Sequence, residues 1–300
     1  GLISFKTYDY QTDLLSDFND YRFNIILKAR QLGISTIAGA YIVWMMLFHR
    51  DKNILVMATK FKTAANLVKK VKAIMKNVPE FLLIAEISID NRASFELSNG
   101  SQIQAASTSG DAGRSEALSL LVIDEAAHVD SLDELWAGLY PTISTGGRVI
   151  ALSTPNGVGN WFHKTYSESV EGSNDFHPVM LNWDIHPDRD MEWFEKETRN
   201  MSRREIAQEL ECNFNTSGET VIHPDDIMWL ESNVKDPKYR TSFDRNMWIW
   251  EEYNPECTYL LVADVARGDG ADYSVFHIIK LDTMEVIAEY QGKPSLDMYS

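Results

Sequence analysis

The sequence has few cysteines and no long apolar run, the features that typically stabilise extracellular proteins and anchor membrane proteins. Only two of its 300 residues are cysteines, Cys212 and Cys257, and their spacing does not suit a metal site. Isolated cysteines are typical of proteins that keep their thiols reduced, so we expect a cytosolic setting. No signal peptide is recognisable and no apolar run is long enough to span a bilayer, so we expect no membrane attachment.

Positive charge is also scarce. Lys and Arg number 28 against 44 Asp and Glu, which gives a formal net charge of −16. This balance argues against passive, tight coating of nucleic acid, although a local basic patch can still grip DNA transiently. One predicted helical stretch is rich in lysine, and a solvated helix face is the simpler interpretation of it. Its lysines are Lys60, Lys62, Lys69, Lys70, Lys72 and Lys76.

Short apolar segments alternate with helix-like segments through the first half of the chain. Runs rich in Ile, Leu and Val suit strands that are buried on both faces, and the alternation predicts an α/β doubly wound domain with a parallel sheet. Asn99-Gly100 predicts a hairpin that adds antiparallel strands at 94–97 and 102–106. The other predicted strands are 23–27, 54–58, 120–123 and 149–153, and the predicted helices are 36–48, 62–76 and 132–140.

The pattern changes near residue 183. Residues 190–211 are charged with a helical period, and 212–255 are irregular and rich in Trp, Pro, Asn and Asp, as in a connecting region. Three strands with short turns follow at 259–265, 274–280 and 285–290, which predicts an antiparallel meander at the start of a second domain. Because the chain begins with Gly1 and stops soon after the third strand, we expect it to be a fragment.

The first chemical motif is the loop between the first predicted strand and the next helix. In the phosphate-loop pattern G-x-x-x-x-G-K-[ST], Gly33 and Ser35 fit the second glycine and the hydroxyl, while Ile34 occupies the lysine position. Lys28 or Arg30 can supply the missing cation, Ser35 can bind Mg²⁺, and the backbone amides favour phosphate. Taken alone, an ordinary strand–helix turn explains the segment as well. The candidate ATP-binding residues are Gln11, Lys28, Ala29, Arg30, Gln31, Leu32, Gly33, Ile34, Ser35 and Thr36.

An apolar strand that ends in Asp124-Glu125 is the partner such a loop needs. Asp124 is expected to hold Mg²⁺, and Glu125 is expected to polarise the attacking water. A strand ending in a solvated acidic turn is the simpler explanation of this dipeptide by itself. The two motifs together, in this order and about 90 residues apart, predict an ATPase.

Three weaker features agree with an ATPase. Gln11, next to aromatic residues, can hydrogen-bond an adenine, and Arg114 on a glycine-containing loop can act as an arginine finger. Ser153, Thr154 and Asn156 follow a predicted strand, where they can sense the γ-phosphate. A polar turn, a surface arginine and a Pro-Asn-Gly turn are the simpler interpretations of these features.

Together these motifs resemble the large terminase subunits of tailed phages, particularly T4-like ones. The resemblance covers nearly the whole chain and depends on the order and spacing of the motifs. Ile34 departs from it, because many members carry the loop lysine there, and Lys28 at the start of the loop is similar to the arrangement in some terminases. The matching segments are 9–11, 29–36, 122–125, 153–157, 209–214 and 217–218.

The resemblance implies a motor that hydrolyses ATP with Mg²⁺ to push double-stranded DNA into a capsid. It implies that Arg30 and Gln31 lie in the phosphate loop and that Glu125 is the catalytic carboxylate, with Ser153 and Thr154 in a motif that couples hydrolysis to movement. Arg30 and Arg114 are the further candidate catalytic residues. The implied partners are double-stranded DNA, the portal protein, the small terminase subunit and other copies of the chain in a ring on the portal. The implied location is the host cytoplasm, on the procapsid during packaging and not in the mature virion.

The resemblance also implies an RNase H-like nuclease domain at the end of the chain. Asp264 ends one predicted strand and Asp272 precedes the next, and paired carboxylates suit two-metal cleavage with Mg²⁺ or Mn²⁺. Without the resemblance, a charged hairpin turn is the simpler interpretation. Further carboxylates would lie beyond residue 300, so we expect no DNA cutting by this fragment. The expected division is a P-loop (RecA/ASCE-like) parallel-sheet ATPase domain at 1–205, a connecting subdomain at 206–255 and a truncated nuclease domain at 256–300.

Three other classes of protein share parts of this pattern. A superfamily 2 helicase or translocase has the loop and the Asp-Glu strand, but it continues into a second motor domain, which the antiparallel meander disfavours. A non-hydrolysing nucleotide-binding scaffold fits the lost loop lysine, but it has no need of Glu125. An RNase H-type recombinase leaves the nucleotide loop without a purpose.

Overall fold

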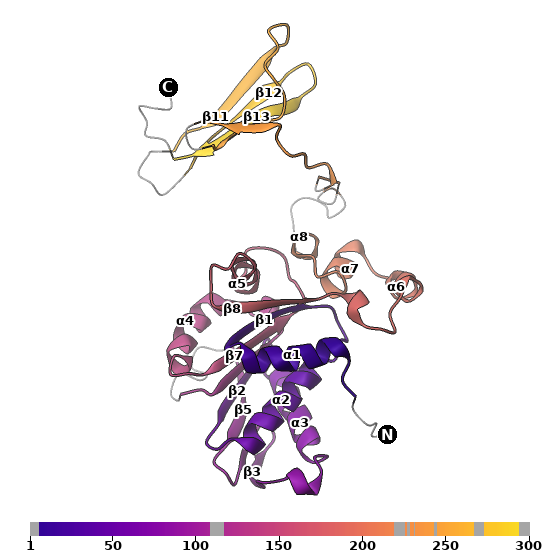
Figure 1. Cartoon of the computed structure of the whole chain (residues 1–300), viewed down its shortest axis with the longest axis vertical. Coiled ribbons are helices and arrows are strands. Elements are labelled where there is room, and N and C mark those ends of the chain that lie inside the picture. Colours follow the sequence, from indigo (N-terminus) through magenta and orange to yellow (C-terminus); the bar gives the residue numbers. More distant parts are fainter. Residues whose placement is uncertain are drawn as a thin grey trace. The chain divides into compact units, whose positions relative to one another are not determined.

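The structure is a computed structural model that describes residues 6–108, 117–218, 226, 229–230, 232–242, 245–266 and 273–293. The chain forms two compact units, Gly1–Met228 and Trp229–Ser300 (Figure 1). Their boundary falls inside the stretch 206–255, for which the sequence predicts a connecting region. Among the described residues, no helix is long and apolar enough to cross a membrane.

The first unit is built on an eight-stranded sheet with the order β3-β4-β5-β2-β6-β7-β1-β8. The six strands from β5 to β8 in this order are parallel, and β3 and β4 extend the sheet as antiparallel strands. This confirms the predicted α/β class with a mostly parallel sheet. The strands are β1 (Phe23–Lys28), β2 (Asn53–Ala58), β3 (Ile87–Asn91), β4 (Ser94–Leu97), β5 (Gln102–Ser107), β6 (Leu120–Asp124), β7 (Arg148–Ser153) and β8 (Phe176–Leu181).

Helices cover both faces of this sheet, as a doubly wound parallel sheet requires. Figure 1 shows α1 (Asp9–Asp20), α2 (Ile34–Phe48) and α3 (Phe61–Met75) on one face, with α4 (Leu132–Ile143) and α5 (Trp161–Val170) on the other. On the α4–α5 side, aromatic rings pack between the helices and the sheet. These rings belong to Phe23, Trp136, Trp161 and Phe176.

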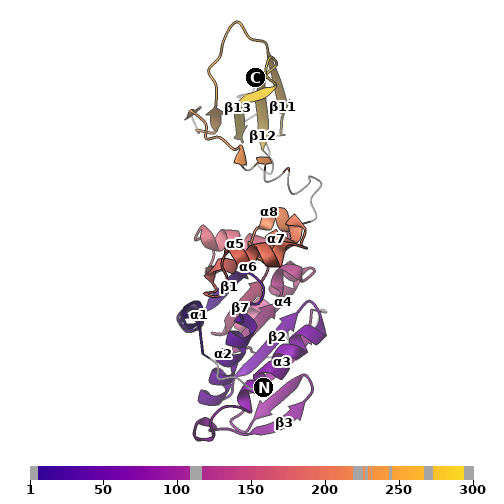
Figure 2. The ribbon, with the colours of Figure 1, turned by 90° about the vertical axis from the view of Figure 1, so that its right-hand side faces the viewer.

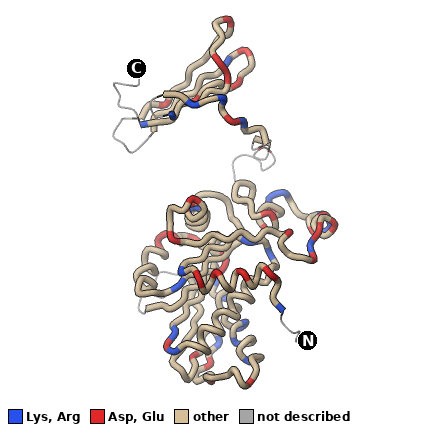
Figure 3. Tube along the Cα trace, viewed as in Figure 1, with Lys and Arg blue, Asp and Glu red and all other residues tan. Residues whose placement is uncertain are grey.

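The predicted charged helical segment consists of two helices, α6 (Met191–Thr198) and α7 (Arg203–Glu209), which are followed by the short α8 (Phe214–Ser217). The break arises because Ser202 caps α7 by accepting a hydrogen bond from Glu205 N, while Glu205 bonds back to Ser202 N. Figure 2 shows these helices together at one end of the first unit, and Figure 3 shows acidic and basic residues gathered on α6 and α7. Three 3₁₀ turns complete the unit, η1 (Glu80–Leu82), η2 (Ala126–His128) and η3 (Trp183–Ile185).

The second unit contains a five-stranded antiparallel sheet with the order β11-β12-β13-β10-β9. The predicted meander is confirmed as β11 (Tyr259–Asp264), β12 (Ser274–Lys280) and β13 (Glu285–Gly292). The sequence did not predict β9 (Tyr239–Thr241) and β10 (Met247–Ile249), which are too short to show alternation.

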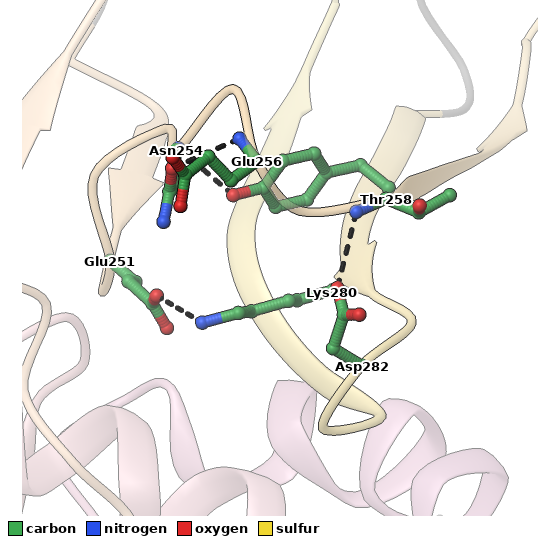
Figure 4. A network of polar contacts seen from close by, with 7 residues as sticks. Glu251, Asn254, Glu256, Thr258, Lys280 and Asp282 are labelled. Atoms are coloured by element: carbon green, nitrogen blue, oxygen red, sulfur yellow. Dashed lines mark hydrogen bonds and ion pairs between the residues drawn. The ribbon is translucent and has the colours of Figure 1, made fainter.

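Polar contacts fix the segment that leads into β11 (Figure 4). Glu251 accepts a 2.5 Å hydrogen bond from Lys280 Nζ, and the amide of Thr258 donates to Asp282 at 3.1 Å. Within the segment, the side chain of Asn254 accepts from the amide of Glu256 at 3.0 Å. These bonds tie the approach to β11 to the turn between β12 and β13.

Candidate active site

The site lies at the carboxyl edge of the parallel sheet in the first unit. Strand β7 pairs with both β1 and β6, so the ends of these three strands come together at one edge. There Ser35 Oγ donates a hydrogen bond to Asp124 Oδ2 at 3.4 Å, although the two residues are 89 positions apart. The structure therefore brings the predicted phosphate loop and the predicted acidic strand end together.

The loop after β1 has the backbone shape of an anion-binding turn. Gln31 and Gly33 adopt left-handed conformations with φ of 59° and 76°, and α2 begins directly afterwards at Ile34. Alternation of this kind turns successive amide N–H groups to one side, where the positive end of a helix dipole adds to their attraction for phosphate. An added Cβ at Gly33 would also lie 2.8 Å from Gln11 Nε2, so the Gln11 side chain would have to shift.

Ile34 occupies the position at which a phosphate loop usually carries its lysine. Its side chain is 2% exposed and packs in the core, so no cation is supplied from that position. The replacement comes from the strand side, where Lys28 ends β1 and lines the cavity described below. Ala29 is buried, and its amide donates to Leu181 O at 2.7 Å, which anchors the start of the loop to β8.

Gln11 contacts the loop rather than open space. It is 3% exposed, its Nε2 donates to Leu32 O at 2.9 Å, and its Oε1 accepts from Tyr8 N at 3.2 Å. Tyr10 Oη donates to the same Leu32 carbonyl at 3.0 Å. In this structure Gln11 supports the phosphate loop, and the predicted hydrogen bond to adenine stays a prediction.

A cavity of about 540 Å³ opens over the loop and the acidic strand end. Its size is within the usual range for small-molecule sites. Cationic, carboxylate and hydroxyl side chains converge on it, which suits a phosphorylated ligand. The lining residues are Lys28, Arg30, Thr59, Lys60, Thr63, Glu125, His128, Thr154 and Glu209.

Lys28 and Asp124 can carry opposite charges, and each counteracts the effect of burial on the pKa of the other. Burial lowers the pKa of Lys28, and the carboxylates of Asp124 and Glu125 act against that shift. Burial raises the pKa of Asp124, and Lys28 acts against that shift in turn. The carboxylate of Asp124 and the hydroxyl of Ser35 are oxygen donors of the kind Mg²⁺ prefers, so the residues present fit this metal.

Glu125 is held in an unusual backbone conformation at the rim of the cavity. Its φ is 58°, a left-handed value that costs a non-glycine residue about 1–2 kcal/mol. Thr59 Oγ1 donates to Glu125 Oε2 at 3.1 Å and fixes the carboxylate. Thr59 was not predictable from the sequence, because only the pairing of β2 with β6 places the residue after β2 beside Glu125.

Arg30 is tied to α7 at two points. Its amide donates to Glu209 O at 2.8 Å, and its Nε lies 2.8 Å from Glu209 Oε2. The guanidinium is mostly exposed, with 66% of the side chain accessible. In the sequence Glu209 is only one residue of a segment that resembles the family, and its place beside the phosphate loop follows from the tertiary fold.

The predicted coupling residues hold the turn that follows Glu125. Ser153 Oγ accepts a hydrogen bond from Ala127 N at 3.1 Å, and Asn156 Nδ2 donates to Ala127 O at 3.3 Å. Thr154 Oγ1 lies 3.2 Å from Nε2 of His128, whose pKa burial lowers. The sequence alone indicated no role for His128. The end of β7 is thereby connected to the turn that follows Glu125.

Two predicted residues, Arg114 and Asp272, lie outside the described residues. Asp264 is exposed at the end of β11 in the second unit. In the part of the chain that the structure describes, no three His, Cys, Asp or Glu side chains form a metal-binding group. The nuclease site and the arginine finger therefore stay predictions.

Comparison with known proteins finds a matching family model and similar curated sequences. Residues 25–228 match the family model described as terminase large subunit, T4likevirus-type, N-terminal. The large terminase subunit of Thermus virus P23-45 is 29% identical over 192 residues, which are 58% of this chain and 36% of that protein. The subunit of Thermus phage G20c is 29% identical over 188 residues. The chain thus spans about a third of the length of these curated relatives.

Solved structures show the same fold. The large terminase ATPase domain of Thermus phage P74-26 superposes with a TM-score of 0.60 at 20% identity, covering 70% of this chain and 94% of that domain. A large terminase from a thermophilic bacteriophage, solved in complex with ATP-gamma-S, gives a TM-score of 0.57 at 11% identity and covers 95% of this chain and 68% of that one.

Proposed function

The chain belongs to the terminase large subunit family, and from this premise we propose that its first unit binds and hydrolyses ATP to drive double-stranded viral DNA into a capsid. The observation that carries the proposal is the contact of Ser35 with Asp124, which directly precedes Glu125, a residue that lines a cavity together with Lys28. The solved relatives in complex with ADP and with ATP-gamma-S support nucleotide as the ligand.

Groups that line the cavity or come from the loop and strand ends beside it have separate roles in the proposed phosphoryl transfer. Ser35 and Asp124 would hold Mg²⁺, which supplies positive charge to the phosphates when bound. Lys28 and Arg30 would neutralise the β- and γ-phosphates, and the loop amides would cradle them. Glu125 would orient and polarise the attacking water. Arg114 would act as an arginine finger, and Ser153, Thr154 and Asn156 would transmit the loss of phosphate through the turn that they hold.

The remaining parts of the proposal concern the longer protein. On the basis of family membership we propose a T4-like character, a ring on the portal, contact with the small terminase subunit and action at the procapsid in the host cytoplasm. We also propose a nuclease site with Asp264 and Asp272. The antiparallel sheet of the second unit does not favour the helicase alternative, because a second motor domain would carry another parallel sheet.

The test compares Glu125→Gln with wild type in binding of Mg²⁺–ATP and in phosphate release. The amide keeps the shape of the side chain but loses the charge that orients water. We expect unchanged binding and a loss of turnover of roughly 10²–10⁴-fold. Glu171→Gln, at the exposed end of α5, is the matched control and should behave as wild type. Failure of the wild-type chain to bind ATP would sink the proposal, and undiminished hydrolysis would remove the catalytic role from Glu125.

A further inference from the structure

Arg189 reaches the phosphate loop from the segment between η3 and α6. Its Nη1 donates to Arg30 O at 3.1 Å and its Nη2 to Gln31 O at 3.2 Å, across separations of 159 and 158 positions. Arg189 is not among the residues that line the cavity. These bonds join two backbone carbonyls of the loop to a single guanidinium.

The two carbonyls lie on either side of the strained residue of the loop. Gln31 has a φ of 59°, a conformation that is unfavourable for a residue with a Cβ and that surrounding contacts must enforce. The next carbonyl, that of Leu32, accepts from Tyr10 Oη and Gln11 Nε2. Three consecutive carbonyls of the loop are thus hydrogen-bonded to side chains, which fixes the orientation of the peptide groups whose amide N–H groups could bind an anion.

The position of Arg189 is itself fixed. Its guanidinium carbon lies 4.5 Å from the centroid of the Trp193 ring, and such stacking suits the planar face of arginine. Asp190 caps α6 by accepting from Trp193 N at 2.8 Å, which sets the first turn of the helix beside Arg189. A rigid fork with two N–H donors matches two neighbouring carbonyls, whereas a lysine ammonium offers a single flexible point.

We propose that Arg189 is a positioning residue that holds the phosphate loop in its nucleotide-accepting conformation by binding the carbonyls on both sides of Gln31. This inference rests on the proposed nucleotide function. It makes the affinity for ATP depend on a side chain that contacts neither phosphate nor metal. It also gives the segment from η3 to α6 a direct effect on the nucleotide site.

The first test measures the Kd of a fluorescent ATP analogue with Mg²⁺ for the 300-residue chain and its variants. Arg189→Ala should weaken binding about tenfold, equivalent to about 1.4 kcal/mol, and Arg189→Lys should fall in between. Added methylguanidinium should restore affinity to Arg189→Ala and leave wild type unchanged. Arg199→Ala, at the exposed end of α6, is the matched control and should bind as wild type does.

A second readout requires no nucleotide. Hydrogen exchange of the amides in residues 29–34 should be faster in Arg189→Ala and unchanged in Arg199→Ala, and a general loss of packing would instead raise exchange throughout α6. If wild type binds no ATP but exchange of the loop amides is faster in Arg189→Ala, the proposed function fails and the role of Arg189 in holding the loop is supported. If wild type binds ATP and Arg189→Ala matches it in both Kd and exchange, the positioning role of Arg189 is overturned.

Discussion

Asp124 is a carboxyl group that the fold buries and that the proposed reaction needs in its ionised form. It is 9% exposed, and burial raises its pKa while Lys28 acts in the opposite direction. A raised carboxyl pKa means that the folded state binds the proton more tightly than the unfolded state. The nucleotide-free fold therefore loses stability as pH rises from the ordinary aspartate pKa through the raised value, and above that value this contribution stays constant.

The same shift predicts the pH dependence of metal and nucleotide binding. Mg²⁺ requires the ionised carboxylate, so the affinity for Mg²⁺–ATP should fall as pH drops through the raised pKa of Asp124. The midpoint should lie above the value of an ordinary aspartate, and Asp124→Asn should bind weakly with that pH dependence removed. Calorimetric titrations at a series of acidic to neutral pH values provide the measurement. A midpoint equal to that of a solvent-exposed carboxyl would contradict the assignment.

At the scale of elements, the buried strands are the part of the fold that the sequence predicts best. Strands β1, β2, β6 and β7 are buried on both faces, so their sequences are nearly continuous apolar runs. Strand β8 was missed because it is at the edge of the sheet, half-buried, and contains His177 and Pro178. Helix α1 was not predicted, although its buried residues Tyr10, Leu14 and Phe18 recur every four positions.

The candidate site was predictable where a motif carries it along the chain. Ser35 and Asp124 follow from the loop and the acidic strand end, and the structure brings them together. Thr59, Arg189 and Glu209 were not predictable, because each reaches the site through strand order or through a helix distant in the sequence. Tertiary contacts of this kind leave no local spacing to recognise.

Gly157, in the segment after β7, packs closely against Gly218 at the end of α8. A Cβ on Gly157 would lie 2.8 Å from the Cα of Gly218, and the amide of Gly157 donates to Ser217 Oγ at 2.9 Å. Gly159 has a similar left-handed φ, 85° against 70°, but nothing lies within 4 Å of its added Cβ. The two positions therefore separate the effect of backbone strain from that of close packing.

Alanine substitution at Gly157 and at Gly159 should destabilise the first unit to different degrees. Gly159→Ala should cost about 1–2 kcal/mol from its left-handed backbone alone. Gly157→Ala should cost about 1–3 kcal/mol more, because the backbone of α8 must move away from the added methyl. Scanning calorimetry of the nucleotide-free chain gives the comparison. Equal costs for the two variants would show that α8 does not pack against Gly157 as described.

At the scale of the whole molecule, the residues around the cavity all belong to the first unit. The lining runs from Lys28 to Glu209, within Gly1–Met228. Nucleotide binding is therefore expected to be a property of this unit. The chain spans 36% of the length of the curated relatives, so packaging and cutting of DNA are proposed for the longer protein.

The most direct test of the account is a crystal structure of the chain with Mg²⁺ and a non-hydrolysable ATP analogue. The account predicts one Mg²⁺ bound by the Ser35 hydroxyl and by Asp124, directly or through water, with the γ-phosphate facing Glu125 and the phosphates on the loop amides after Lys28. A nucleotide bound away from this loop, or a metal contacting neither Ser35 nor Asp124, would contradict it.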